Sequence, residues 1–193
     1  MATETLDPTL PQRILIVGTS CAGKTTLAAN IAGRLGIRHF DLDDFHWLPG
    51  WQERSRQAFT EQVRQHILPE PQWVVSGNYT SAARQTIWPS ARTIIWLDYP
   101  LWLVLGRYFR RTFRRIVYRE PCCNGNYETL GNAIFRHDNL FFWILRTHYS
   151  RRPRYRRWMR EGTMRATWIV LRGKHETEAF LARLPHRGRK ISA

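Results

Sequence analysis

Short apolar runs alternate with longer stretches of mixed polarity along this chain. Runs such as TIIWL at 93–97 and ATWIVL at 166–171 are apolar almost throughout, which is typical of strands buried on both faces of a parallel sheet. Helical patterns separate the runs, so we expect a single α/β domain over residues 1–193. The predicted strands cover 14–17, 38–42, 73–75, 93–97 and 166–171.

Apolar positions recur at helical spacing between the predicted strands. Leu27, Ile31 and Leu35 form one stripe, and Gly36 follows as a helix stop. After Pro100, apolar residues again recur at helical spacing with arginines mostly on the other side. We expect that apolar face, which includes Phe109 and Phe113, to belong to the core. The predicted helices cover 25–35, 53–68, 101–116, 132–147 and 176–184.

The first predicted strand runs into a glycine-rich segment. Gly18 is followed by four residues and then by Gly23, Lys24 and Thr25, which is the pattern G-x-x-x-x-G-K-T of a P-loop. Backbone N–H groups of such a loop point inward around phosphate, and the following helix adds its positive dipole end. Lys24 supplies a cation for the β- and γ-phosphates, and Thr25 offers its hydroxyl to Mg²⁺. We therefore predict an ATP site made by Gly18, Thr19, Ser20, Cys21, Ala22, Gly23, Lys24, Thr25 and Thr26.

Three acidic residues follow the second predicted strand. Asp41, Asp43 and Asp44 stand at the carboxyl end of that strand, which is the ligand side of an open α/β sheet. We predict that Asp41 or Asp43 holds Mg²⁺ together with Thr25, and that Asp43 or Asp44 takes a proton from an acceptor hydroxyl. The alternative is that Asp43 or Asp44 only caps a turn.

Two further polar residues follow predicted strands. Many P-loop proteins carry a magnesium-binding Asp after the strand beside the P-loop strand, and here Ser76 occupies that place. Either Ser76 takes a weaker version of this role, or the Asp41, Asp43 and Asp44 group supplies the carboxylate, which we prefer. Asp98 ends the fourth run, where it serves as a helix N-cap or as a site residue.

Arginine dominates the second half of the chain. Between residues 107 and 172 there are 16 arginines and four acidic residues. A solvated basic face is the default explanation, but so many like charges favour an anionic partner. In a phosphotransferase, arginines of a helical lid neutralise charge on the transferred phosphoryl group. The lid candidates are Arg107, Arg110, Arg111 and Arg114, with Arg107 and Arg111 predicted to be catalytic, and Arg172 is a candidate for contact with adenine.

Composition and net charge indicate the kind of partner and the cellular compartment. The 193 residues carry a net charge of +15, which implies anionic partners such as nucleotides, phosphorylated metabolites or nucleic acid. Three cysteines without C-x-x-C spacing indicate neither a disulfide framework nor a zinc site, which is typical of a reducing cytosol. No apolar run approaches the roughly 18 residues of a membrane span, and the first dozen residues lack an apolar signal core. We therefore expect a cytoplasmic protein.

Two basic stretches allow other functions. Residues 151–160 mix arginine with Tyr155 and Trp158, which together can grip nucleic acid. The helix at 101–118 can lie on an anionic membrane surface, although a core role for its apolar face is simpler. The aromatic loop at 46–51 is either a stacking surface for an acceptor ring or a hydrophobic plug. The sequence does not indicate an oligomeric state.

The ordered set of motifs resembles the nucleoside-monophosphate and shikimate kinase group of P-loop proteins. Within that group the chain is most similar to the branch called topology modulation proteins, which is related to adenylate kinases. It departs from the pattern WVIDGNY at Ser76, and it lacks the D-G-F-P-R segment that adenylate kinases use beside AMP. The resemblance is carried by GTSCAGKTTLA, LDDFHWLPGW, WVVSGNY, IIWLDYP with GRYFRRTFRR, and NGNYET.

The resemblance implies a fold and an activity. It implies a P-loop NTPase three-layer sandwich with a five-stranded parallel sheet in the order 2-3-1-4-5, an acceptor-binding insert around 44–72 and an arginine-rich helical lid around 107–160. By the same resemblance, residues 18–26 bind ATP with Mg²⁺ and the helix at 107–115 serves the lid. The expected activity is ATP-dependent phosphoryl transfer to a small molecule or nucleotide. The alternative is a nucleotide-binding protein associated with nucleic acid.

Overall fold

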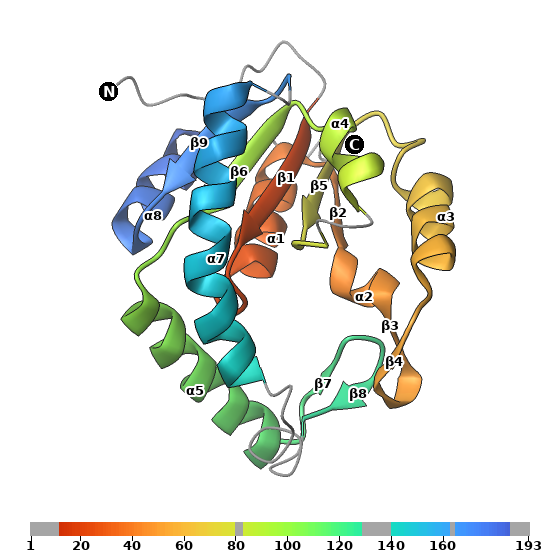
Figure 1. Ribbon diagram of the computed structural model, residues 1–193, viewed down its shortest axis with the longest axis vertical. Coiled ribbons are helices and arrows are strands. Elements are labelled where there is room, and N and C mark those ends of the chain that lie inside the picture. The colour runs from red at the N-terminus through yellow and green to blue at the C-terminus, as the bar shows by residue number, and fades with distance from the viewer. Residues whose placement is uncertain (1–11, 80–82, 129–139, 163–164, 186–193) are drawn as a thin grey trace, which may run out of the picture.

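A parallel sheet forms the centre of the molecule. The computed structural model describes residues 12–79, 83–128, 140–162 and 165–185 (Figure 1). Its five-stranded sheet has the order β2-β5-β1-β6-β9, which is 2-3-1-4-5 when only the strands of this sheet are counted, so the predicted order is confirmed. The strands are β1 (Arg13–Gly18), β2 (Arg38–Asp41), β5 (Trp73–Ser76), β6 (Thr93–Leu97) and β9 (Thr167–Leu171).

The central strand β1 explains how the sheet presents a site. Residues 14–17 are fully buried because helices cover both faces of the sheet. At the end of β1, a Cβ atom on Gly18 would lie 2.8 Å from the carbonyl oxygen of Leu97, so glycine allows β1 and β6 to pack closely there. Ser76 pairs with both Ile16 and Asp41, which brings the ends of β1, β5 and β2 to one edge.

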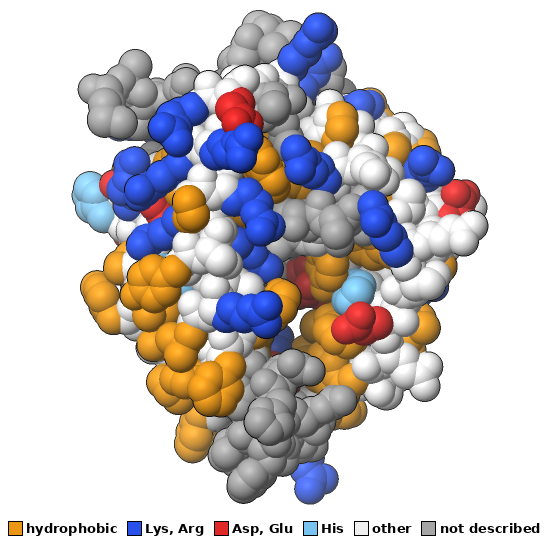
Figure 2. Space-filling model, viewed as in Figure 1, with side chains coloured by type: hydrophobic (Ala, Val, Ile, Leu, Met, Phe, Trp, Pro, Cys, Tyr) orange, Lys and Arg blue, Asp and Glu red, His pale blue; other side chains and the backbone are white. Residues whose placement is uncertain are grey.

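One face of the sheet is covered by α3 (Arg56–His66), α4 (Ile87–Ser90) and the long α7 (Leu140–Glu161). Tyr155 and Trp158 of α7 are buried with Trp88 in this layer. Figure 2 shows that Lys and Arg side chains gather over the outer surface of α7. The prediction that Tyr155 and Trp158 stack on nucleic-acid bases is therefore wrong, because the amphipathic helix turns them into the core.

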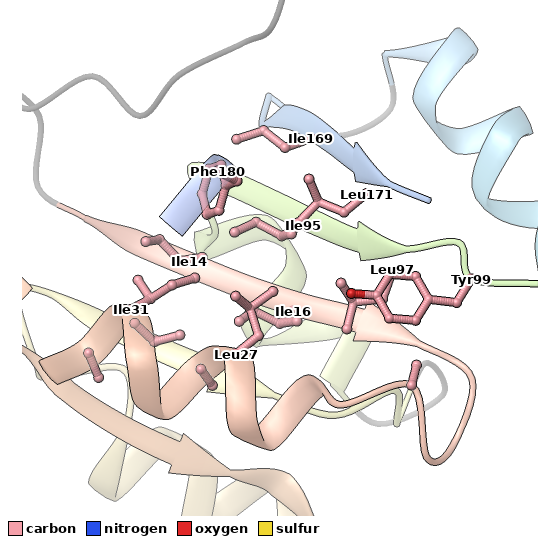
Figure 3. Packing of buried hydrophobic residues seen from close by; sticks show 14 of the residues in the cluster. Ile14, Ile16, Leu27, Ile31, Ile95, Leu97, Tyr99, Ile169, Leu171 and Phe180 are labelled. Atoms are coloured by element: carbon pink, nitrogen blue, oxygen red, sulfur yellow. The ribbon is translucent and has the colours of Figure 1, made fainter. Parts of the chain in front are cut away.

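The other face is covered by α1 (Lys24–Leu35) and α8 (Lys174–Arg183). Leu27 and Ile31 of α1 meet Ile14 and Ile16 of the sheet, as Figure 3 shows. The stripe read from the sequence is therefore the buried side of α1. This packing holds the first turn of α1 at the end of β1, where the P-loop lies.

The helix α5 (Leu101–Val117) has a different orientation from the one expected. Val104 and Tyr108 are buried, whereas Phe109 and Phe113 are 59% and 68% exposed. The expectation that Phe109 and Phe113 belong to the core is therefore wrong. Helical spacing identifies an apolar side, but α5 carries apolar residues on two sides, and only one of them packs on the core.

A second set of elements lies beyond the edge of the sheet. A short helix, α2 (Leu42–His46), leads into a ribbon of β3 (Trp47–Leu48) and β4 (Gln52–Glu53), joined by the 3-10 turn η1 (Pro49–Trp51). Another 3-10 turn, η2 (Ala83–Gln85), precedes α4. A hairpin of β7 (Pro121–Cys122) and β8 (Asn126–Tyr127) follows α5.

The β7–β8 hairpin is fastened to the β3–β4 ribbon (Figure 1). Asn124 Nδ2 donates to the carbonyl oxygen of Trp47 at 2.7 Å, and Asn126 Nδ2 donates to that of Leu48 at 3.0 Å. In return, the backbone N–H of Trp51 donates to Asn126 Oδ1 at 2.9 Å. The β7–β8 hairpin thus joins the far end of α5 to the insert around 44–72.

Several predicted boundaries change in the structure. The second strand ends at Asp41, and the helix predicted from residue 53 begins at Arg56 because Gln52 and Glu53 pair in the ribbon. Of the helix predicted over 132–147, the part before Leu140 lies outside the described residues. No helix within the described ranges is long and apolar enough to span a bilayer.

Asp98 does not cap α5, whose N-cap residue is Pro100. Its carboxylate instead accepts a hydrogen bond from Arg152 Nε at 2.5 Å and lies 3.9 Å from Arg156 Nη2. The cap prediction is therefore wrong. The buried carboxylate ties the end of β6 to α7, because an ion pair satisfies the charge that burial would otherwise leave unpaired.

Candidate active site

The P-loop has the backbone shape that phosphate binding requires. The N–H of Ala22 donates to the carbonyl oxygen of Thr19 at 3.1 Å, which closes a tight turn. Cys21 and Gly23 adopt positive φ values of 65° and 97°, and Gly23 is the N-cap of α1. Burial raises the pKa of the Cys21 thiol, which keeps this loop residue neutral. The first N–H groups of α1 have no partner within the helix, so they are available to an anion.

Lys24 lies against the loop that precedes it. Its Nζ donates to the carbonyl oxygen of Thr19 at 3.2 Å. Burial lowers the pKa of Lys24, and the nearby Asp43 carboxylate opposes that shift. An ammonium group held in a poorly solvated place interacts strongly with any phosphate that enters. The predicted contact of Lys24 with the β- and γ-phosphates stays a prediction.

Asp41 joins the second strand to the P-loop helix. Its Oδ2 accepts from the Thr25 hydroxyl at 2.6 Å, and its Oδ1 accepts from the backbone N–H of Asp43 at 3.1 Å. The residue that caps the following helix is therefore Asp41. The alternative that Asp43 or Asp44 is only a cap is wrong. Burial and the neighbouring Asp43 carboxylate raise the pKa of Asp41. A cation bound at this place would stabilise the charged form of the Asp41 carboxylate.

Thr25 and Asp41 fit the magnesium ion that the P-loop pattern predicts. A hydroxyl and a carboxylate oxygen in contact are hard donors of the kind that Mg²⁺ prefers, and a nucleotide's phosphates and water supply the rest. Among the described residues there is no group of three or more His, Cys, Asp or Glu side chains suited to a metal.

Asp43, in the first turn of α2, also lines the cleft. Its Oδ1 accepts from the Tyr79 hydroxyl at 2.6 Å. Burial and this carboxylate raise the pKa of Tyr79, so the phenol stays protonated and acts as a donor. Burial also raises the pKa of Asp44, followed in effect by Asp41 and Asp43. The three carboxylates thus differ in role, because Asp41 contacts Thr25 whereas Asp43 contacts Tyr79.

Ser76 lies on the same side of the sheet as Asp41 but is not among the residues that line the cleft. It is fully buried, and its Oγ lies 3.1 Å from His39 Nε2. Because Ser76 pairs with Asp41 on the adjacent strand, a carboxylate stands one strand away from the usual position. This arrangement favours our preference for the aspartate group over Ser76. Two residues further along, the Asn78 side chain makes two hydrogen bonds with the backbone of Gly18. Its Oδ1 accepts from the Gly18 N–H at 3.1 Å, and its Nδ2 donates to the Gly18 carbonyl oxygen at 2.7 Å.

Gly77 allows the β5 loop to approach α2. Its φ is +141°, and a Cβ atom there would lie 2.7 Å from Leu42 Cβ. We expect Gly77→Ala to lower the free energy of unfolding by about 1–3 kcal/mol through overpacking and backbone strain. Gly33→Ala is the matched control, because nothing lies within 4 Å of that site, and a gain of about 0.5–1 kcal/mol is expected within the helix. Urea unfolding measures both, and equal stability of Gly77→Ala and the wild type would contradict this account.

The cleft gathers most of the predicted residues and adds others. It has a volume of about 1460 Å³ and is lined by residues 20–26 of the P-loop and by Asp41, Asp43, Asp44, Arg107, Arg111 and Arg114. Gly18 and Thr19 are buried behind it. Arg110 does not line the cleft, and Arg172 lines a separate hollow with Arg152, Arg156 and Arg160. Figure 2 shows the surface hollowed between α7 and the β3–β4 ribbon.

The cleft arginines differ in how they are held. Arg107 Nη1 donates to the carbonyl oxygen of Ala22 at 2.5 Å, with its guanidinium 4.8 Å from the Tyr99 ring centre. Arg111 and Arg115 share the Glu128 carboxylate at 3.3 and 2.6 Å. Arg107 therefore connects α5 to the P-loop. The charges of Arg111 and Arg115 are partly neutralised by the Glu128 carboxylate.

Sequence reasoning missed Arg151 as a cleft residue. It lines the cleft from α7, and its Nη1 is buried without a hydrogen-bond partner among the described residues. Lys24 lines the same cleft, and the charge of Arg151 lowers its pKa. Burial in turn lowers the pKa of Arg151. The guanidinium lies 5.5 Å from the centre of the Trp143 ring. Its buried Nη1, which makes no hydrogen bond to a described residue, is suited to an anion. No local sequence signal separates Arg151 from its neighbours.

Aromatic rings line the opposite side of the cleft. The rings of His46 and Tyr79 lie 4.6 Å apart, and those of Trp47 and Trp51 lie 5.5 Å apart. All four residues line the cleft. The loop therefore offers flat surface to a ligand, although Trp51 Nε1 also holds the hairpin by donating to the carbonyl oxygen of Tyr127.

Comparison with known proteins establishes the fold. No protein-family model and no curated protein matches this chain. Shikimate kinase from Acinetobacter baumannii, in complex with shikimate, has a TM-score of 0.59 and 19% identity, covering 91% of this chain and 90% of that one. A gluconokinase from Sinorhizobium meliloti 1021 has a TM-score of 0.51 and 18% identity, covering 91% and 94%.

Shikimate kinase from Bacteroides thetaiotaomicron is similar as well, with a TM-score of 0.53 and 16% identity over 90% of this chain and 96% of that one. At such identities the likeness concerns the fold. The chain has the shikimate-kinase-like α/β fold. The narrower resemblance to topology modulation proteins stays a prediction.

Proposed function

We propose that this protein is a kinase that transfers the γ-phosphoryl group of ATP to a hydroxyl group of a small molecule. The carrying observation is that one cleft holds Lys24, the Thr25–Asp41 pair and the Asp43–Tyr79 pair. A protein that only binds nucleotide would need Lys24 and the Thr25–Asp41 pair but not the Asp43–Tyr79 pair. Asp43 adds a carboxylate next to the phosphate site, which is what an acceptor hydroxyl needs.

The phosphate side of the cleft supports ATP binding. The P-loop backbone and the N-terminus of α1 would cradle the phosphates, with Lys24 over the terminal ones. Thr25 and Asp41 would hold Mg²⁺, which supplies charge neutralisation when it is bound. Arg151, which has a buried unpartnered donor, would contact the transferred group. Adenine would lie near Tyr99 and Thr177, which line the same cleft.

Asp43 would act as the general base. Its Oδ1 is held by Tyr79, and its Oδ2 makes no hydrogen bond to a described residue. As the acceptor oxygen forms its bond to the γ-phosphorus, the acceptor proton would pass to Oδ2 and the bond from phosphorus to the β,γ-bridging oxygen would break. The products are ADP and the phosphorylated acceptor, and catalysis comes from positioning and charge.

The acceptor side supports a small ring-bearing ligand. His46, Trp47 and Tyr79 present flat surfaces beside the Asp43 carboxylate. The hairpin covers that side by its hydrogen bonds to the ribbon, which would limit access of water. An acceptor rich in hydroxyl groups matches this lining, because the Asp43 and Asp44 carboxylates can accept hydrogen bonds from hydroxyl groups.

The function is tested by release of ADP from Mg²⁺-ATP. Acceptor candidates are nucleosides, nucleoside monophosphates and small sugars and polyols, tested singly, and duplex DNA is a parallel arm. Stimulation by one small acceptor, with a phosphorylated product detected by mass spectrometry, is the expected result. Stimulation by DNA alone would instead favour a nucleic-acid-associated protein, the alternative that the net charge of +15 still supports.

Arg151 gives a matched pair of variants. We expect Arg151→Ala to lower kcat about a hundredfold, because a positioned cation at a transferring phosphoryl group typically contributes that much. Arg154→Ala is the control, since Arg154 is exposed on the same helix and should leave kcat within about twofold, as surface charges usually do. Steady-state kinetics with saturating ATP measure the ratio. Equal effects of the two variants would exclude a specific role for Arg151.

A further inference from the structure

One side of α5 carries large apolar side chains in contact with solvent. Trp102, Phe109, Phe113 and Val117 are 73%, 59%, 68% and 53% exposed. They follow one another at intervals of seven, four and four residues, so they form one line along the helix. We call these four residues the outer stripe. It lies opposite the buried Val104 and Tyr108.

The outer stripe continues onto α7. The Phe109 ring lies 6.0 Å from that of Phe141, and on α7 Phe142 and Tyr149 are 58% and 62% exposed. Figure 2 shows hydrophobic side chains gathered over α5. Apolar surface of this extent on a folded protein is typical of an interaction site.

The charges around the outer stripe indicate the charge of its partner. The helix α5 contains five arginines and no acidic residue. Arg110, which borders the stripe, is exposed and makes no ion pair with a described residue. Two copies packed stripe to stripe would bring these like charges together in a chain of net charge +15, so a second copy is disfavoured. An anionic partner with an apolar interior complements both features.

We propose that the outer stripe docks this protein on the surface of an anionic lipid bilayer. A helix with aromatic side chains on one face and arginine beside them lies in the interfacial plane, with its apolar face at the headgroup boundary. Trp102 is suited to that depth, and exposed arginines gain from anionic headgroups. Arg107 and Arg111 project from the other side of α5 into the cleft, so docking would leave the cleft accessible.

Vesicle flotation with the full chain tests the proposal. We expect the protein to float with vesicles of phosphatidylcholine and phosphatidylglycerol but not with phosphatidylcholine alone. The double variant Phe109→Ser, Phe113→Ser should lose about tenfold or more of the bound fraction. Met159→Ser is the control, because Met159 is an exposed apolar residue away from the stripe. Thermal unfolding and vesicle-free ADP release, measured on each variant, separate lost docking from lost folding or lost catalysis.

Binding that requires phosphatidylglycerol and is lost in the double variant would support the proposal. Binding to neither vesicle would overturn it. Equal binding of the double variant and the wild type would also overturn it, because general attraction of a basic protein would then suffice. A wild-type dimer in light scattering that the double variant loses would assign the stripe to self-association instead. None of these outcomes depends on the kinase activity.

Discussion

Replacement of Lys24 by alanine is expected to reduce kcat at least about a thousandfold, because the loss of a preorganised charge at a transferring phosphoryl group has effects of this order. The ammonium group lies at the start of α1 against the P-loop backbone, whereas Arg151 enters the same cleft from α7. Arg107 is nearby but is engaged with the carbonyl oxygen of Ala22 and the ring of Tyr99.

The same variant should fold normally. Burial lowers the pKa of Lys24, so the folded protein holds this ammonium in an unfavourable environment. Its removal should leave the thermal midpoint unchanged or raise it. Lys174→Ala is the matched control, because Lys174 is 76% exposed and pairs only with Glu178 among the described residues, and it should keep the wild-type kcat. Substantial turnover by Lys24→Ala would place the reaction outside the P-loop.

Asp43→Asn is the second change with a large expected effect. Loss of a general base typically lowers kcat about a hundredfold to ten-thousandfold. ATP affinity should stay within about twofold, because Thr25 and Asp41 remain in place. The packing should also survive, since the amide oxygen can still accept the hydrogen bond from Tyr79. Steady-state kinetics and nucleotide titration separate the two effects.

Two companion variants sharpen the result for Asp43. Tyr79→Phe removes the hydrogen bond to Asp43 but keeps the carboxylate, so a smaller loss of about tenfold is expected, in line with a positioning role. Glu61→Gln, an exposed acidic change outside the cleft, controls for the loss of one negative charge. A near-normal kcat of Asp43→Asn would mean either that Asp44 is the general base or that the reaction uses no general base. A loss of ATP binding would instead make Asp43 part of the metal site.

The sequence predicts the sheet well because its signals are local. The run at 93–97 coincides with β6, since a strand buried on both faces requires apolar residues throughout. The P-loop is equally readable, because glycine, lysine and threonine act within eight consecutive residues. The order of the strands came from the family resemblance, because periodicity carries no information on which strands are neighbours.

The sequence is less informative where a residue's role depends on a distant partner. The side chains of Asn124 and Asn126 fasten the hairpin to Trp47 and Leu48, which are more than 70 positions away along the chain. Arg151 belongs to a run of similar arginines, and only the path of α7 brings it into the cleft that Lys24 also lines. Tyr155 and Trp158 in that run are core residues for the same reason.

The sequence alone thus determined the strands, the phosphate-binding loop and the carboxylates that follow β2, because each is written in residues that are close along the chain. The tertiary structure decided which carboxylate meets Thr25 and which arginine enters the cleft. It also decided which side of α5 faces the core, because Phe109 and Val104 have equally apolar side chains and only the packing of α5 on its neighbours distinguishes them. Contacts between distant segments depend on the whole fold, and spacing along a helix does not encode them.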